Sequence, residues 1–438
     1  MSWERLSEVA VVVKVRLELF EGEKARIFGP ARLRVGSGRI IILGAELSKG
    51  DTVRIADNRS YTLKSQSRSV VEVDLEGYGR VEAPKDEEEP IDEWVALADA
   101  ILDECDRPCI VAVIGPVDAG KTSFSALIAN RALSRNIQPA IIDADVGQAD
   151  IGPPGFISLG MPDTWITWLR ELEPEAMRFI GSIEPGPVAG RILASIVNLV
   201  NEALAGGAGI VVIDTDGWTS GWNAMEYKLD LVRLVGVDHV VVMGDVDLYR
   251  SIGESIHARV YYARSPLVYA ERSINDRKRL RAENYRRYIG SSTREVDLSR
   301  IPVQGSCIIP GVRIVDEDTY RICRETLKLD VVLMTRYPGG ICVLVDSSDQ
   351  PDTQAIKSLQ RKLGSEVIVL YTGGLKNILA ALTDPQGNDH PALLEEIDLD
   401  SLKAIFKTRY TGPLARVAFG RIRLGPDYRE EGGRRLWI

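Results

Sequence analysis

The stretch that decides the fold is Val111-Ala-Val-Ile-Gly-Pro-Val-Asp-Ala-Gly-Lys-Thr-Ser123, in which an apolar run leads directly into Gly115-x-x-x-x-Gly120-Lys121-Thr122. This is the spacing of a phosphate loop, whose glycines permit a turn with backbone N–H groups facing the phosphates. The lysine places a positive charge on the outer phosphates, and the threonine hydroxyl can hold Mg²⁺. A buried strand before the loop and a helix after it support the pattern. We therefore expect an ATP-binding site formed by Gly115, Pro116, Val117, Asp118, Ala119, Gly120, Lys121, Thr122 and Ser123.

Length and composition limit the class of protein. The chain has 438 residues, 45% of them apolar, so two or three domains with substantial cores are expected. No apolar run reaches the ~18 to 20 residues that span a bilayer, and the N-terminus lacks a signal pattern, so we expect no membrane association and a cytoplasmic location. A net charge of −9 argues against broad coating of nucleic acid but allows a local basic groove.

The cysteines and histidines suggest no special chemistry. The chain has five cysteines, an odd and scattered set without C-x-x-C spacing, which favours buried thiols in a reducing compartment over a disulfide framework. The three histidines are isolated as well. We therefore expect no zinc site.

The pattern along the chain predicts three domains. Short alternating runs broken by glycine predict an N-terminal β domain over residues 1–83, followed by a proline-bounded acidic linker over 84–93. Over residues 94–300 strands alternate with helices, which predicts an α/β domain with a doubly wound parallel sheet and ligands at the strand carboxyl ends. Residues 301–438 predict a mixed, β-rich α/β domain.

Three carboxylates follow predicted strands at the edge that holds the phosphate loop. Asp143 and Asp145 end the strand near residues 138–142, and alternation sends both side chains to one face. Asp214 ends the strand near residues 209–213 as a Walker B carboxylate would. Each could bind Mg²⁺, orient the reacting hydroxyl, or only form a turn. The sequence leaves this division of roles open.

Two further segments bear on function. The nearest match to a guanine-recognition motif is Tyr227-Lys228-Leu229-Asp230, which has the wrong first residue and lies in a helical pattern, so a GTPase is disfavoured. Residues 272–287 carry seven Lys or Arg against two acidic residues. Such a run is either a solvated helix face or, in this position after the last strands, a lid over the nucleotide.

Four motifs together resemble a known family. They are Gly115-Pro116-x-Asp118-x-Gly120-Lys121-Thr122, Asp145-Val-Gly-Gln148, Thr215-x-Gly217-Trp218 and Arg272-Ser-x-x-x-Arg277. In order and spacing they resemble the polynucleotide 5′-hydroxyl kinases of RNA 3′-end cleavage and ribosomal-RNA processing. The resemblance covers the whole chain, and it implies a central phosphate-loop domain between an N-terminal β-sandwich-like domain and a C-terminal mixed, β-rich domain.

The resemblance also implies roles for single residues. Asp145 would be the base at the attacking hydroxyl and Gln148 would contact substrate. Thr215, Gly217 and Trp218 would form a clasp on the terminal nucleotide, where a tryptophan can stack on any base. Arg272 and Arg277 would be lid arginines that, with Lys121, act on the transferring phosphoryl group. Thr122, Asp143 and Asp214 would hold Mg²⁺, although Asp143 stands where many relatives have Glu and Asp214 where some have Asn.

These features predict an ATP-dependent kinase that phosphorylates the 5′-hydroxyl end of RNA, with single- or double-stranded DNA as a candidate additional substrate and ATP and Mg²⁺ as cofactors. A catalytically silent, ATP-bound scaffold of an RNA-processing complex is the second hypothesis. A phosphate-loop ATPase or small-metabolite kinase is the third, and it leaves the clasp and lid unexplained. Because the loop lysine, the clasp tryptophan and both lid arginines are present, catalysis is favoured. The sequence does not identify protein partners.

Overall fold

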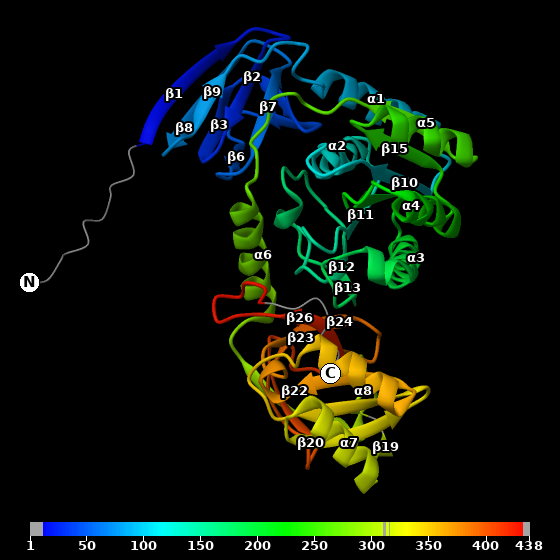
Figure 1. Ribbon diagram of the computed structural model, residues 1–438. Coiled ribbons are helices and arrows are strands. Elements are labelled where there is room, and N and C mark those ends of the chain that lie inside the picture. The colour runs from blue at the N-terminus through cyan, green and yellow to red at the C-terminus, as the bar shows by residue number, and fades with distance from the viewer. Residues whose placement is uncertain (1–11, 310–311, 315, 432–438) are drawn as a thin grey trace, which may run out of the picture. The chain divides into compact units, whose positions relative to one another are not determined.

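The computed structural model describes residues 12–309, 312–314 and 316–431 (Figure 1). The chain divides into two compact units. Unit 1 comprises Met1–Asp145, Leu159–Glu175 and Leu193–Arg277, and unit 2 comprises Val146–Ser158, Ala176–Ile192 and Lys278–Ile438. Each unit combines segments from more than one of the three predicted domains, whose boundaries stay a prediction.

The N-terminal part of unit 1 consists of two antiparallel sheets, as the alternating sequence predicts. In β3 the side chains of Leu33 and Val35 are buried and those of Arg32 and Arg34 are exposed, which is the pattern of a strand with one face on a core. The four-stranded sheet has the order β1 (Val12–Leu19), β8 (Ser69–Glu76), β3 (Ala31–Ser37), β6 (Thr52–Ile55). The five-stranded sheet has the order β5 (Ala45–Ser48), β4 (Arg39–Ile42), β7 (Ser60–Ser65), β2 (Lys24–Phe28), β9 (Arg80–Glu82).

The acidic segment over residues 84–93 is paired with basic side chains of this β region. Arg26 is only 2% exposed, and its guanidinium lies 3.3 Å from the Glu88 carboxylate. Lys24 Nζ lies 2.9 Å from Asp86 Oδ1. A buried charge requires a partner, so these acidic residues compensate cations on β2. The segment is therefore anchored along the β region and is not a free linker.

The central sheet has seven strands with the phosphate loop after β10. In unit 1, β10 pairs in parallel with both β14 and β15. The strands that follow β10 in the chain lie on one side of it up to β14, and β15 and β16 lie on its other side, which creates a switch point at β10. The predicted strands near 110–114, 138–142, 209–213 and 238–243 are confirmed as β10, β11, β14 and β15. The order is β13 (Ala176–Phe179), β12 (Phe156–Gly160), β11 (Pro139–Ala144), β14 (Ile210–Thr215), β10 (Cys109–Ile114), β15 (His239–Met243), β16 (Arg259–Ala263).

Helices connect these strands, as expected for a doubly wound sheet. They are α1 (Ile91–Glu104), α2 (Lys121–Leu133), α3 (Ala189–Ala205), α4 (Trp222–Val235), α5 (Val246–Ser255) and α6 (Ile274–Ile289), with the 3₁₀ turns η1 (Leu169–Glu171) and η2 (Gly186–Val188). By length and composition the run Gly186–Ala205 could cross a membrane, which the sequence reading did not anticipate. Nearly half of it is buried inside the protein, and core helices of soluble proteins share these properties.

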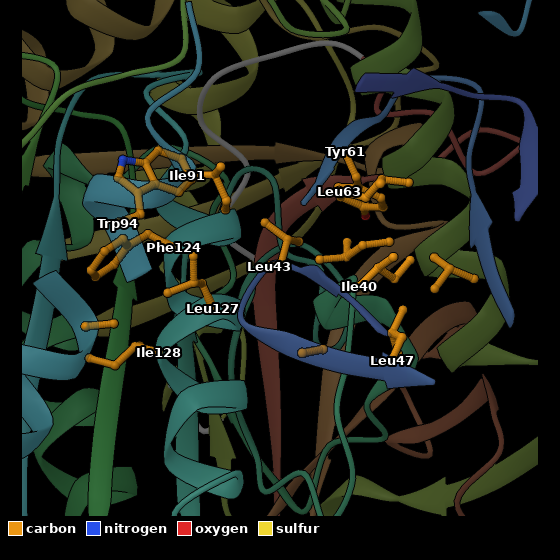
Figure 2. Packing of buried hydrophobic residues seen from close by; sticks show 14 of the residues in the cluster. Ile40, Leu43, Leu47, Tyr61, Leu63, Ile91, Trp94, Phe124, Leu127 and Ile128 are labelled. Carbon is orange, nitrogen blue, oxygen red and sulfur yellow. The ribbon is translucent and has the colours of Figure 1, made fainter. Parts of the chain in front are cut away.

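One hydrophobic cluster joins the β region to the helices around the phosphate loop. Figure 2 shows Leu43 between side chains of the β region and those of α1 and α2, where Trp94 packs edge-on against Phe124 with ring centroids 5.9 Å apart. The buried Asn130 side chain on α2 donates to the carbonyls of Leu43 at 2.8 Å and Ile166 at 2.7 Å. Within unit 1, the β region and the helix that follows the phosphate loop therefore share one core.

Unit 2 carries the β-rich C-terminal region that the sequence predicts. Its six-stranded sheet has the order β17 (Thr293–Asp297), β25 (Lys403–Thr408), β24 (Asp389–Asp398), β23 (Ile378–Thr383), β26 (Arg416–Arg423), β18 (Val303–Gln304). Its four-stranded sheet has the order β19 (Val312–Arg313), β20 (Val331–Tyr337), β21 (Gly340–Val345), β22 (Glu366–Tyr371). The remaining elements are α7 (Glu317–Leu327), α8 (Thr353–Leu363), η3 (Leu298–Arg300) and η4 (Thr372–Gly374).

The expectation of free thiols is wrong for four cysteines. Cys105 and Cys109 form one disulfide, with Cα atoms 5.8 Å apart, and Cys307 and Cys342 form another, with Cα atoms 5.9 Å apart. The first pair meets because a short loop joins α1 to β10. The second pair is separated by 35 residues and is brought together only by tertiary packing, which spacing does not reveal. Cys323 is free and buried, as expected.

Candidate active site

The phosphate loop connects β10 to α2 as the motif predicts. Gly120 has φ +100°, a conformation that side chains rarely adopt, and Asp118 also lies in the left-handed region with φ 62°. A Cβ on Gly115 would lie 2.6 Å from the carbonyl oxygen of Met243 at the end of β15. Both motif glycines are therefore required by the backbone, and the loop presents the N-terminus of α2, where backbone N–H groups favour anions.

The ammonium group of Lys121 is hydrogen-bonded to the backbone of the phosphate loop. Lys121 is the first residue of α2, is only 7% exposed, and donates from Nζ to the carbonyl of Pro116 at 2.9 Å. Thr122 and Ser123 follow in the first helical turn and are half-buried. The loop is thus followed by one ammonium and two hydroxyl groups in the first turn of α2.

Two of the three candidate carboxylates are neighbours on adjacent strands. Asp143 on β11 and Asp214 on β14 are in register in a parallel pair, and both are 2% exposed. Asp145 follows the end of β11, is half-buried, and donates its backbone N–H to Asp143 Oδ1 at 3.2 Å. Carboxylate oxygens are hard donors of the kind that Mg²⁺ prefers. Asp143 and Asp214 thus form an adjacent pair within the sheet, and Asp145 lies just beyond the end of β11.

Residues Thr215–Trp218, which the resemblance predicts to form the clasp, pack on the phosphate loop and on α4. The hydroxyl of Thr215 donates to the carbonyl of Val113 at 2.9 Å, which fixes the end of β14 to β10. A Cβ on Gly217 would lie 2.5 Å from Cγ2 of Val117, so only glycine fits against the phosphate loop there. The half-buried Trp218 ring stacks on Tyr227, with centroids 5.7 Å apart and planes at 26°.

A buried ion pair lies beneath the clasp, and the sequence reading missed it. Lys228 is fully buried, and its Nζ lies 3.0 Å from Asp216 Oδ1 and 3.1 Å from the Asp216 carbonyl oxygen. The same carboxylate accepts from Tyr227 Oη at 2.8 Å and from the Trp218 backbone N–H at 2.9 Å. Burial lowers the pKa of Lys228 against the opposing effect of Asp216, and burial raises the pKa of Tyr227. One carboxylate therefore positions both the clasp backbone and the ring beneath its tryptophan.

The helix α6, which the sequence predicts to be a lid, contacts the phosphate loop through Arg277. Arg277 Nη2 lies 2.5 Å from Asp118 Oδ2, so this predicted lid arginine contacts a loop residue that is 159 positions away in sequence. A reciprocal capping box starts the helix, in which Ser273 N–H donates to Asp276 at 3.0 Å and Asp276 N–H donates to Ser273 at 3.1 Å. Arg272 lies just before this cap and is half-buried.

The segment that leads into the lid is anchored to the acidic segment and the β region. The Arg264 guanidinium binds the Glu93 carboxylate through two N–H groups, with distances of 2.7 and 2.9 Å. The indole N–H of Trp94 donates to the Arg264 carbonyl at 2.9 Å, and Ala270 N–H donates to Ser60 Oγ at 3.1 Å. The approach to α6 is thus held on both sides within unit 1.

Gln148 belongs to unit 2, unlike the other predicted site residues, and is half-buried. The loop after it is fixed within unit 2 by Asn284 of α6, whose amide donates to the carbonyls of Ala149 at 2.7 Å and Gly152 at 3.2 Å.

A second aromatic residue near the clasp, Trp222, was not assigned a role from sequence. It opens α4 and is 76% exposed.

This chain is similar in sequence to a known protein family. Residues 115–291 match the model of the mRNA cleavage and polyadenylation factor CLP1 P-loop. The polyribonucleotide 5′-hydroxyl-kinase of Pyrococcus furiosus is 30% identical over 341 residues, which are 74% of this chain and 90% of that protein. The polyribonucleotide 5′-hydroxyl-kinase of Pyrococcus horikoshii is 28% identical over 352 residues, 79% of this chain and 93% of that protein.

A solved structure supports the fold independently. A Clp1p–Pcf11p complex contains a chain that matches with a TM-score of 0.61 at 14% identity, covering 94% of this chain and 98% of that one. At that identity the likeness concerns the fold alone. Together with the identity to the archaeal enzymes over most of their length, it confirms the resemblance drawn from the four motifs. The chain therefore belongs to the polyribonucleotide 5′-hydroxyl-kinase family and carries its CLP1-type P-loop.

Proposed function

We propose that this chain transfers the γ-phosphate of ATP to the 5′-hydroxyl end of RNA. The observation that carries the proposal is the meeting of three distant motifs at two residues of the phosphate loop. Gly217 of the clasp packs on Val117, and Arg277 of the lid pairs with Asp118. An ATPase needs the phosphate loop, whereas a nucleotide clasp and a lid arginine on that loop serve a second, acceptor substrate.

The loop and its neighbours suit a nucleotide with a bound cation. The turn is too tight for side chains at its glycines, α2 presents its N-terminus, and Lys121 adds a positive charge. Thr122, Asp143 and Asp214 are the residues that would hold Mg²⁺, since the last two form a buried carboxylate pair at the same register. When bound, the ion would neutralise charge on the phosphate oxygens.

We assign the transfer step to residues around this pair. Asp145 accepts the proton of the RNA 5′-hydroxyl while the oxygen of that hydroxyl forms a bond to the γ-phosphorus of ATP. The bond between the γ-phosphorus and the oxygen that bridges the β- and γ-phosphates breaks, which releases ADP. Lys121, Arg272 and Arg277 stabilise the charge on the phosphoryl group while it moves. Such catalysis depends mainly on position, which is why contacts from lid and clasp to the loop matter.

The clasp tryptophan is the proposed contact for the terminal nucleotide. One face of the Trp218 ring stacks on Tyr227, and the ring is half-buried. A base can therefore stack on the indole whatever its identity, because stacking needs no base-specific hydrogen bonds. The exposed Trp222 offers a second aromatic surface four residues further on. Thr215 acts by holding the strand end, since its hydroxyl donates to a backbone carbonyl. Stacking alone does not distinguish RNA from DNA.

The proposal is tested by measuring transfer of labelled γ-phosphate from ATP to oligoribonucleotides. Wild-type protein should label a 5′-hydroxyl RNA and leave a 5′-phosphorylated RNA of the same sequence unlabelled. Lys121→Ala should abolish labelling, and Lys49→Ala, an exposed lysine in the β region, should retain it. A DNA oligonucleotide of the same sequence measures acceptor preference. Equal labelling by Lys121→Ala and wild type would refute the assignment of the phosphate loop to catalysis.

A further inference from the structure

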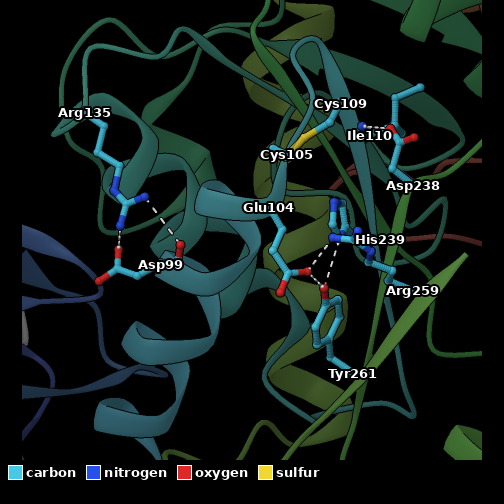
Figure 3. Close-up of a disulfide and its surroundings, with 10 residues drawn as sticks. All are labelled: Asp99, Glu104, Cys105, Cys109, Ile110, Arg135, Asp238, His239, Arg259 and Tyr261. Atoms are coloured by element: carbon cyan, nitrogen blue, oxygen red, sulfur yellow. Dashed lines mark hydrogen bonds and ion pairs between the residues drawn. A yellow bond between two sulfur atoms is a disulfide. The ribbon is translucent and has the colours of Figure 1, made fainter.

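A second cluster of reactive side chains lies at the edge of the central sheet opposite the phosphate loop. Cys105 follows α1, Cys109 is the first residue of β10, and His239 is the first residue of β15. The phosphate loop follows the last residue of β10, so the cluster is at the strand amino ends. The sulfur atoms and a ring nitrogen all lie within 4.8 Å of one another, which overturns the expectation that the histidines are isolated and that there is no candidate zinc site (Figure 3).

Hydrogen bonds fix the imidazole in one tautomer. Tyr261 Oη donates to Glu104 Oε2 at 2.7 Å and lies 3.2 Å from His239 Nδ1, so the tyrosine oxygen accepts the Nδ1 proton. Arg259 Nη1 donates to the same Glu104 oxygen at 2.7 Å. Burial together with the bond to Glu104 raises the pKa of Tyr261 to about 12, and burial lowers the pKa of His239. With its Nδ1 proton bonded to the tyrosine oxygen, the imidazole carries its free lone pair on Nε2.

The backbone holds the cluster in place. Strands β10 and β15 pair in parallel with Val111 opposite His239. The Ile110 N–H donates to Asp238 Oδ2 at 2.8 Å, and the Asp238 N–H donates to the Ile110 carbonyl at 3.0 Å. These bonds join the residues next to Cys109 and His239, which are 1% and 3% exposed. Cys105 is half-buried and gives the cluster access to solvent.

We propose that Cys105, Cys109 and His239 form a redox-gated Zn²⁺ site, in which the cation binds the reduced cysteine pair and the disulfide excludes it. A dithiol supplies the two electrons and two protons that convert the disulfide into two thiols and itself becomes a disulfide. Zn²⁺ then displaces both thiol protons and binds two thiolates and Nε2, a donor set that zinc favours over harder cations. The fourth position is left for water, and Tyr261 with Glu104 orients the histidine from behind.

The test uses full-length protein reduced with a dithiol, freed of reductant without oxygen, and titrated with Co²⁺ as a spectroscopic substitute for Zn²⁺. One equivalent should produce a sulfur-to-cobalt charge-transfer band that added Zn²⁺ removes, and unreduced protein should show none. Cys105→Ser and His239→Gln should lose the band. The matched controls Cys323→Ser and His257→Gln should keep it. Tyr261→Phe should bind about 10- to 100-fold more weakly, the range for loss of a group that orients a metal ligand.

Each variant is checked by circular dichroism and ATP binding without metal, so a folding defect is separated from the loss of a ligand. Cys105 is the less buried of the two cysteines, so its serine variant disturbs the core less than a change at Cys109 would. Two results would overturn the proposal: folded, reduced wild type without the band, or a band of equal affinity in Cys105→Ser and His239→Gln.

Discussion

Lys228→Met tests the buried ion pair beneath the clasp. The change keeps most of the side-chain length and removes the ammonium that lies 3.0 Å from Asp216 Oδ1. Both side chains are almost fully buried, so solvent would screen the remaining carboxylate little. Breaking a buried pair from one side costs about 3–5 kcal/mol. Because Asp216 would retain Tyr227 Oη and the Trp218 N–H, we expect the lower end, about 3 kcal/mol.

Thermal unfolding and kinetics together measure this effect. For a folding unit of about 150–250 residues each kcal/mol shifts Tm by about 2–4 °C, so Tm should fall by about 6–12 °C. Below that temperature the Michaelis constant for RNA should rise while that for ATP stays near wild type, because Asp216 positions Trp218 and not the phosphate loop. The exposed Lys49→Met is the matched control.

A double-mutant cycle identifies the pair itself. Asp216→Asn removes the buried charge that Lys228→Met leaves uncompensated, so the double variant should be clearly more stable than the sum of the two single losses. Additive losses, or a Tm for Lys228→Met within 1 °C of Lys49→Met, would refute the claim that this ion pair stabilises the clasp.

Four further substitutions address the site. Arg277→Ala should lower the rate at saturating substrate at least tenfold, as a modest share of the ~10³ to 10⁵ that arginine fingers contribute; a salt-sensitive loss of RNA affinity at unchanged rate would instead make α6 a tether. Trp218→Ala should raise the Michaelis constant for RNA in line with ~1 to 3 kcal/mol of stacking, with ATP binding unchanged, and a purely structural tryptophan would lower Tm alone. Asp145→Asn should reduce turnover far more than ATP affinity, and a larger rate loss in Asp214→Asn would reverse their roles.

The sequence predicted the parts of the fold that depend on local pattern. Residues 109–114 form an unbroken apolar strand before glycines that the turn requires, so the strand, loop and helix follow from covalent geometry and burial. The basic run over 272–287 was read as a helix, which α6 confirms, and its role as a lid stays a prediction. In both cases a few neighbouring residues carry the information.

Features that depend on tertiary packing were not predicted. The helix α7 is amphipathic but short and polar, and the reading of the C-terminal region passed over it. Lys228 lies on the buried stripe of Ala224, Tyr227 and Leu231, a spacing that could have marked it as a buried cation with a partner. The identity of that partner, Asp216, depends on how β14 and α4 pack. The pairing of Cys307 with Cys342 is hidden for the same reason.

The central claim is that the phosphate loop, clasp and lid form one site for transfer to an RNA end. A single-turnover experiment with enzyme in excess over γ-labelled ATP tests it most directly, because it follows where the label goes. With 5′-hydroxyl RNA present, we expect the label at the RNA 5′ terminus, with little released as inorganic phosphate, and 5′-phosphorylated RNA should leave the ATP intact. Label released as inorganic phosphate whatever the RNA end, or ATP that remains bound and uncleaved with 5′-hydroxyl RNA, would contradict the account.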